Sequence, residues 1–307
     1  MTPLVAGLDE EGARLARGRA LVLLATVFWS IGGPLVRFIE SAEAWQILFY
    51  RSSSLVVFLL AWLLLTEGRR LPAMLRAAGW PAVLAGLCIG ATFSLYILAI
   101  TQTTVANVLF LLSCSPILGA VLGQFLLGEA VRRTTWIAMA IALVGVGVMV
   151  GDGLAAGGAL GDLLGLAAAL GFALYSVVLR WRKKADMLPS VLYGGLFGTL
   201  FATTLCLIGG LPFVLSPADT LFALLLGTLN LGVGLVLYTR GARLLPVAEG
   251  TLLSLLEVVL GPLLTWLLVA EVPKLSTLIG GAILLPAVLI YASTGLRRRR
   301  PPTAMVT

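Results

Sequence analysis

A single carboxylate lies in the middle of a long apolar stretch. The segment from Pro246 to Glu271 is apolar for long enough to cross a hydrocarbon core of about 30 Å, which takes about 20 helical residues. Glu257 falls about 16 Å into that helix, at 1.5 Å per residue. A charge near mid-membrane costs at least about 2.5 kcal/mol, so such residues usually face a cavity or a partner. We expect Glu257 to bind a substrate amine or a proton; a structural hydrogen bond between helices is the alternative.

Other polar and aromatic side chains inside apolar runs are further candidates for this site. Buried amides either bind a ligand or hydrogen-bond neighbouring helices. Aromatic rings can stack on a solute, pack the core or, for Tyr96 and Tyr238, form part of the interfacial aromatic belt. The predicted substrate-binding residues are Glu257, Asn107, Trp29, Tyr175, Asn230 and Tyr96.

Three other charged residues near span ends have a structural explanation. Glu249 lies in the first turn of its helix, where the dipole favours a carboxylate, and an ion pair with Arg240 or Arg243 is expected. Arg37 and Arg51 lie near the ends of the first two spans. For both we expect pairing with nearby carboxylates or snorkelling toward the membrane surface.

The residue types that would hold a metal or a cofactor are missing from the sequence. It contains no histidine, and its three cysteines fall inside apolar runs without a disulfide or metal spacing. It has no GxxxxGK[ST] phosphate loop, and neither HExxH nor GxSxG. We therefore expect no metal, no cofactor and no enzyme activity. An intramembrane enzyme would need paired acid and base groups at one depth, whereas Glu257 stands almost alone.

Composition places these residues in a membrane protein. The chain is 60% hydrophobic and 11% charged, with a mean hydropathy of +1.06, whereas a soluble domain has about a quarter of its residues charged. The net charge of +7 comes from short basic clusters between apolar runs, so no nucleic-acid partner is expected. The apolar runs lack the strict alternation of barrel strands. They predict ten membrane helices, at residues 20–39, 45–65, 79–101, 103–127, 134–151, 160–181, 189–210, 217–240, 246–270 and 276–294.

The chain also repeats itself after 142 residues. The shift aligns the run 104–129 with 246–271 and pairs Gly119 with Gly261. Five spans per copy is an odd number, so the second copy enters the membrane upside down, as in many secondary transporters. The predicted fold is therefore an all-α polytopic membrane protein of ten transmembrane helices, arranged as two inverted five-helix repeats. We divide the chain into a tail at 1–19, repeats at 20–151 and 160–294, and a basic tail at 295–307.

Two prolines and the basic residues predict gating and orientation. Pro116 and Pro262 lie in the two best-matching spans, where proline removes a helical hydrogen bond, and we expect them to be bending points of opposed gates. All but three of the 21 basic residues fall on one side of the predicted membrane; the exceptions are Arg37, Arg51 and Lys274. This bias predicts that both termini lie in the cytoplasm.

The stretch around Leu255-Leu256-Glu257, its copy from Val105 to Glu129, and Phe28-Trp29-Ser30 resemble the drug/metabolite transporter superfamily, specifically the ten-span EamA-type exporters. The resemblance covers about residues 20–294. It implies export of amino acids or other small metabolites across the bacterial inner membrane, and the branch that exports aromatic amino acids has this size and layout. It also implies a central cavity between spans 1–4 and 6–9, with spans 5 and 10 outside. The family commonly has proline after this glutamate, whereas Val258 follows here.

We therefore predict a multi-pass inner-membrane protein that exports a small neutral or zwitterionic solute, most simply an amino acid, by alternating access. Within transport, a proton-coupled multidrug exporter is the alternative. The four-span multidrug relatives use a glutamate in their first span, which this chain lacks in both corresponding spans. An intramembrane enzyme or a scaffold is the alternative from another class.

Overall fold

A computed structural model describes residues 3–102, 105–150, 159–270, 272 and 275–297 of the chain, and within these residues it contains helices and no strands. The first half comprises α1 (Pro3–Ser30), α2 (Gly32–Arg37), α3 (Ala44–Glu67), the short η1 (Gly68–Arg70), α4 (Leu71–Gln102), α5 (Val105–Leu112), α6 (Ser115–Leu127) and α7 (Arg133–Val150). The second half comprises α8 (Ala159–Trp181), α9 (Leu188–Ile208), α10 (Pro217–Leu225), the π-helix η3 (Leu226–Val233), α11 (Gly234–Ala242), α12 (Val247–Ser254), α13 (Leu256–Val269) and α14 (Leu275–Arg297).

These helices account for the ten predicted spans. In the part of the chain that the structure describes, seven segments are long and apolar enough to cross a membrane, and one of them, Ala44–Ala99, contains both α3 and α4. Two shorter apolar helices, Arg133–Val148 and Leu275–Val288, supply the fifth and tenth spans. Four spans are built from consecutive pieces: α1 with α2, α5 with α6, α10 with η3 and α11, and α12 with α13. The predicted all-α polytopic fold is confirmed.

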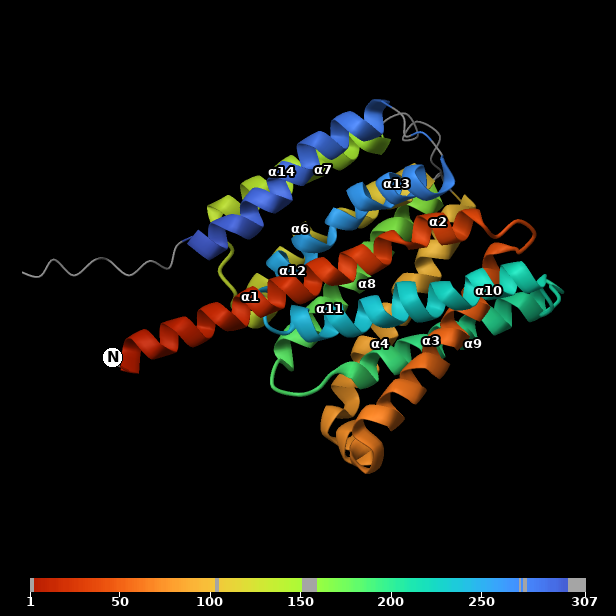
Figure 1. Cartoon of the computed structure of the whole chain (residues 1–307), viewed down its shortest axis with the longest axis horizontal. Coiled ribbons are helices and arrows are strands. Elements are labelled where there is room, and N and C mark those ends of the chain that lie inside the picture. Colours follow the sequence, from red (N-terminus) through yellow and green to blue (C-terminus); the bar gives the residue numbers. More distant parts are fainter. Residues whose placement is uncertain (1–2, 103–104, 151–158, 271, 273–274, 298–307) are drawn as a thin grey trace, which may run out of the picture.

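The helices of each half pack mainly against helices of the other half. The third span, α4, packs along α8 and α9, and its counterpart in the second half, formed by α10, η3 and α11, packs along α1 and α3. The fifth span, α7, lies beside the tenth, α14, along one side of the bundle (Figure 1). Because each half contributes five crossings, the second half runs in the opposite direction to the first, and the exchange of partners is the one expected of inverted repeats.

Glycines allow the closest of these approaches. A Cβ atom on Gly90 of α4 would lie 2.9 Å from the carbonyl oxygen of Gly194 of α9, so only glycine fits there. The core is formed by fully buried side chains such as Leu55, Leu59 and Leu63 of α3. Large apolar side chains such as Leu65 and Phe125 are exposed, as a lipid-facing surface requires.

Two helices begin earlier than the sequence predicts. The first span continues as one helix from Pro3, so described residues of the predicted N-terminal tail are helical. The third span was expected to start at residue 79, but helix begins at Leu71 and bends at Gly79, whose φ of 57° is left-handed. Glycine adopts that conformation without the penalty that a Cβ atom would bring.

Candidate functional site

Spans 4 and 9 are broken at equivalent positions. The first break lies at Ser113 and Cys114, between α5 and α6, and the second at Leu255, between α12 and α13. Ser113 and Leu255 are related by the shift of 142 residues. Pro116, in the first turn of α6, explains the first break because it has no N–H to continue the ladder.

The second break occurs without a proline at its own position. The Leu255 N–H bonds to the Leu252 carbonyl at 3.2 Å and the Val258 N–H to the Leu255 carbonyl at 3.0 Å, so the helix tightens here to a three-residue spacing. Pro262 lies inside α13, beyond the break. Of the two predicted bending points, only Pro116 therefore adjoins a break in its span.

Glu257 occupies the first turn of α13, directly after the second break. It is deep in the bundle and yet its side chain is partly accessible. Among the described residues, no side chain or main-chain group bonds to its carboxylate. One turn further on, a Cβ atom on Gly261 would meet no described atom within 4 Å. Glu257 and Gly261 are four residues apart and therefore lie on one face of α13, which has open space beside the glycine.

Tyr96 of α4 lies near this carboxylate, since it is close enough to feel the charges of both Glu257 and Arg51. Arg51 of α3 holds its guanidinium over the ring of Phe93, at 5.3 Å from the ring centre. Its Nε and Nη2 atoms are buried and have no hydrogen-bond partner. The expected pairing of Arg51 with a carboxylate is therefore wrong within the described part of the chain.

Four aromatic rings pack together where α1, α8 and α11 meet. The Trp29 ring lies 5.1 Å from that of Tyr238 and 6.1 Å from that of Phe172, and the rings of Tyr175 and Tyr238 are 6.3 Å apart. Tyr175 and Tyr238 are completely buried. Tyr238 is thus a core residue and does not belong to an interfacial belt. Its position near a span end suggested the belt, but hydropathy does not show which way a ring points.

The hydroxyls of the two tyrosines are paired with neighbouring helices. The Tyr175 hydroxyl lies 2.6 Å from that of Thr239, and the Tyr238 hydroxyl lies 2.7 Å from that of Ser176. Buried hydroxyls need such partners. Of the predicted aromatic site residues, Tyr175 is therefore a packing residue. Trp29 has an indole nitrogen without a hydrogen-bond partner, and Tyr96 is partly accessible.

Trp29 fits because its neighbour in α11 is a glycine. A Cβ atom on Gly234 would lie 2.3 Å from Trp29 Nε1, and this indole nitrogen has no hydrogen-bond partner. Asn230, in the π-helix, donates from its amide nitrogen to the main-chain oxygens of Phe28 at 3.0 Å and Trp29 at 2.6 Å. Asn230 therefore ties η3 to the end of α1, the linking role that was the alternative to ligand binding. The side chain of Asn107 lies outside the described residues.

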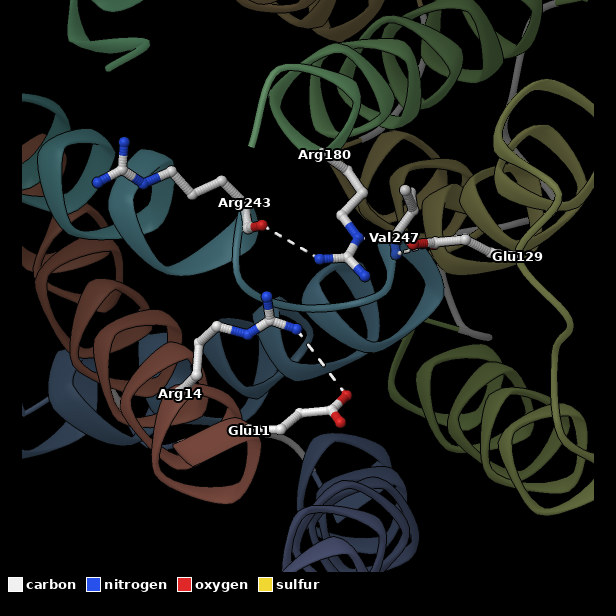
Figure 2. Close-up of polar contacts among 6 residues, drawn as sticks. All are labelled: Glu11, Arg14, Glu129, Arg180, Arg243 and Val247. Atoms are coloured by element: carbon white, nitrogen blue, oxygen red, sulfur yellow. Dashed lines mark hydrogen bonds and ion pairs between the residues drawn. The ribbon is translucent and has the colours of Figure 1, made fainter. Parts of the chain in front are cut away.

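Ion pairs close the end of the bundle at which α1 starts and α14 ends, which we call the basic end (Figure 1). Glu249 of α12 is paired with Arg19 of α1, and both side chains are buried. The predicted partners, Arg240 and Arg243, are wrong, since the pair joins two spans that are distant in the sequence. Glu129 accepts from Arg180 at 2.5 Å and from the Val247 N–H at 3.1 Å (Figure 2).

The two halves of spans 4 and 9 differ in how closely they pack. Near the basic end, α6 packs against α12, and a Cβ atom on Gly119 would lie 3.1 Å from Val247 Cγ1 and 3.2 Å from Thr251 Oγ1. Toward the opposite end, α5 and α13 make few or no contacts among the described residues. Gly261 of α13, the repeat equivalent of Gly119, faces the open space described above.

Two equivalent pairs of residues are hydrogen-bonded at the two ends, although through different groups. At the opposite end the Glu40 N–H bonds to an Asp219 carboxylate oxygen at 3.0 Å, and at the basic end Arg182 Nη2 bonds to the Ala77 carbonyl at 3.2 Å. Glu40 corresponds to Arg182, and Ala77 to Asp219, under the 142-residue shift. The contact between α6 and α12 is therefore a departure from a symmetry that the surrounding loops keep.

Two inverted helical repeats, with segments long and apolar enough to cross a membrane, are the architecture of a polytopic membrane transporter. The chain belongs to the EamA-like transporter family, whose model matches residues 16–151 and 159–293. This confirms the resemblance to the drug/metabolite transporter superfamily.

Relatives of the chain agree with this assignment. It is 30% identical over 224 residues to an uncharacterized transporter of Archaeoglobus fulgidus, covering 72% of this chain and 80% of that protein. It is 28% identical over 311 residues to an uncharacterized transporter of Pseudomonas aeruginosa, covering 94% of this chain and 97% of that one. A solved crystal structure superposes with a TM-score of 0.75 at 18% identity, over 92% of this chain and 99% of the other, and so shares the fold.

Proposed function

We propose that this secondary transporter exports small metabolites, and in particular amino acids including aromatic ones, across the bacterial inner membrane by alternating access. The observation that carries the proposal is Glu257, an unpaired and partly accessible carboxylate deep in the bundle. An accessible carboxylate without a protein partner can bind the ammonium group of an amino acid when it is ionised. No part of the packing around Glu257 in the described residues uses that charge.

Trp29 and Tyr96 are the aromatic residues that we assign to the site. Trp29 is 8% exposed and its indole N–H is unpaired, while Tyr96 is partly accessible and close to Glu257. An aromatic ring offers apolar contact to a side chain and, at its polar edge, one hydrogen bond. Asn230 holds the end of α1, which carries Trp29, through its hydrogen bonds to the Phe28 and Trp29 carbonyl oxygens.

The unequal packing of spans 4 and 9 supports alternating access. Inverted repeats can exchange conformations, so the close packing of α6 on α12 at one end would be replaced by packing of α5 on α13 at the other. Glycine at both Gly119 and Gly261 allows either contact. The bias of basic residues toward the basic end orients it to the cytoplasm. In this orientation the close contact between α6 and α12 would lie at the cytoplasmic end of the bundle.

Proton-coupled export of hydrophobic cations is the second candidate, and the same lone carboxylate favours it. A carboxylate that exchanges a proton for a cationic solute needs to be unpaired and accessible from one side at a time. The two candidates differ in the solute and in the response to a pH gradient, so one experiment separates them.

The test uses the purified full-length protein in liposomes. Each radiolabelled amino acid is assayed with and without a pH gradient, beside a hydrophobic cation, in protein-containing and empty liposomes. We expect flux of one or more amino acids that depends on the protein. Flux of the cation alone would replace the first candidate by the second, and absence of flux for every solute would favour a scaffold or an intramembrane enzyme.

A further inference from the structure

Arg51 has no counterion among the described residues, and its buried Nε and Nη2 atoms have no hydrogen-bond partner. We propose that Arg51 binds the carboxylate of the transported solute. Together with Glu257 it would form a two-point site for a zwitterion, with Arg51 at the carboxylate and Glu257 at the ammonium group. This inference rests on the proposed function and adds a second substrate-binding residue to it.

The main chain of Arg51 is held by the π-helix of span 8. A Cβ atom on Gly227 would lie 2.1 Å from the Arg51 carbonyl oxygen, and Ser54 Oγ bonds both to that oxygen, at 3.1 Å, and to the Leu224 carbonyl, at 3.2 Å. This contact fixes one face of α3 against η3. The Arg51 side chain extends instead toward α4, where it lies over Phe93.

The guanidinium has hydrogen-bonding capacity that the protein does not use. The Phe93 ring stabilises the positive charge through its face. It leaves the N–H groups in the guanidinium plane unbonded, and Nε and Nη2 have no partner. Arginine presents its donors as a planar fork that matches the two oxygens of a carboxylate. A solute carboxylate is therefore the complement that this side chain lacks.

We place Arg51 and Glu257 in one site because Arg51 lies over Phe93, one turn before Tyr96 on α4, and Glu257 lies near Tyr96. Both charges act on Tyr96, so the tyrosine lies within electrostatic reach of each. No ion pair joins Arg51 to Glu257 among the described residues. Opposite charges that share a site without touching favour a ligand that bears both charges over one that bears either alone, because a singly charged ligand leaves the other residue uncompensated.

The experiment compares solutes that differ by one charged group. The first set is phenylalanine, phenethylamine, which lacks the carboxylate, and 3-phenylpropionate, which lacks the amine; the second is leucine, 3-methylbutylamine and 4-methylpentanoate. Flux of each is measured in liposomes for the native protein and for Arg51→Gln, Arg51→Lys and Glu257→Gln. Arg69→Gln, at an exposed arginine of η1, is the matched control. Thermal melting in detergent checks that each variant is folded.

We expect the native protein and Arg69→Gln to prefer the amino acid at least tenfold over either analogue. Arg51→Gln should reduce the preference over the amine at least tenfold while amine flux persists, and Arg51→Lys should retain part of it. Glu257→Gln should reduce the preference over the acid in the same way. An unchanged preference in Arg51→Gln, or an equal loss of all three fluxes in a folded variant, would overturn the role of Arg51 and leave the proposed function standing. If the native protein moves neither amino acid, both proposals fail for these solutes.

Discussion

Gly119 and Gly261 occupy equivalent positions in the two repeats, yet only at Gly119 would an added Cβ atom meet another helix among the described residues. Its Cβ position is 3.1 Å from Val247 Cγ1, whereas that of Gly261 has no described atom within 4 Å. The two halves of the chain are therefore in different conformations at a point where their sequences agree. This difference gives the proposed exchange of states a pair of matched positions at which to test it.

Replacing each glycine by valine should have opposite effects. Gly119→Val forces two methyl groups into a filled contact and should destabilise the present conformation by about 1–3 kcal/mol. Gly261→Val enters open space, so its melting temperature should match the native value, but its transport should fall because the exchanged state needs a close approach there. Melting in detergent and initial transport rates provide the two readouts.

Gly250→Ala is the control for these variants, since its nearest neighbours would lie at 3.9 Å. It should change neither readout. Full transport by Gly261→Val would show that α5 and α13 do not close on each other through this position.

The Arg19–Glu249 pair should contribute much more to stability than its surface counterpart. Both of its side chains are buried, so Glu249→Gln leaves Arg19 without a counterion and should cost about 3 kcal/mol. The pair Arg14–Glu11 lies nearby, at 3.9 Å and largely exposed (Figure 2), and Glu11→Gln should change stability little. Thermal or denaturant unfolding in detergent measures both.

A double variant distinguishes lost pairing from lost packing. Arg19→Met with Glu249→Leu removes both charges and keeps apolar volume, so it should recover much of the stability lost in Glu249→Gln. Equal losses in the single and double variants would contradict the assignment of the effect to an uncompensated charge.

Glu257→Gln should impair transport without unfolding the protein. The carboxylate makes no hydrogen bond or ion pair among the described residues, so its removal should leave the melting temperature unchanged or raise it. If Glu257 binds the ammonium group, KM for an amino acid should rise at least tenfold; if it carries a proton, the dependence of flux on a pH gradient should disappear. Liposome assays at several solute concentrations and gradients separate the two. Unchanged KM and unchanged gradient dependence would remove Glu257 from the site.

Pro116 and Pro262 should differ in their effect on transport rate. Pro116→Ala restores an N–H next to the break between α5 and α6 and should slow exchange between states, because it favours a continuous helix. Pro262→Ala, inside α13, should have a smaller effect. Pro286→Ala in α14 is the control, since it removes a proline from a span outside the bundle centre. Equal rates in Pro116→Ala and the native protein would place the bending point elsewhere.

The order and number of spans were predictable because hydropathy reports directly on what can lie in lipid. The repeat was predictable as well, since the identity of Gly119 with Gly261 and their neighbours survives in the sequence. The break at Leu255 was not, because no proline marks it. The equivalence of Leu255 and Ser113 follows only from the structure, in which α12 and α5 each end just before these residues.

The partners of charged residues could not be predicted from the sequence. These helices are apolar on most of their circumference, so hydropathy does not determine which face points inward. Glu249 was matched to Arg240 and Arg243, which are close in the chain, whereas the structure brings it to Arg19. Arg51 was expected to find a carboxylate in the neighbouring loop. The only signal that could have distinguished it is its position several residues inside an apolar run.

The contact between Trp29 and Gly234 has a counterpart with the sizes reversed. Gly171 and Thr92 occupy the equivalent positions, and a Cβ atom on Gly171 would lie 2.6 Å from Thr92 Oγ1. The bulky Trp29 thus lies on the first span of the first half, and the glycine that makes room for it, Gly234, lies on the third span of the second half. A chain assembled from two copies of the first half would set Trp29 against Thr92, and one from two copies of the second would set glycine against glycine. At this contact the two halves are therefore complementary in size, and two copies of either half would not reproduce it.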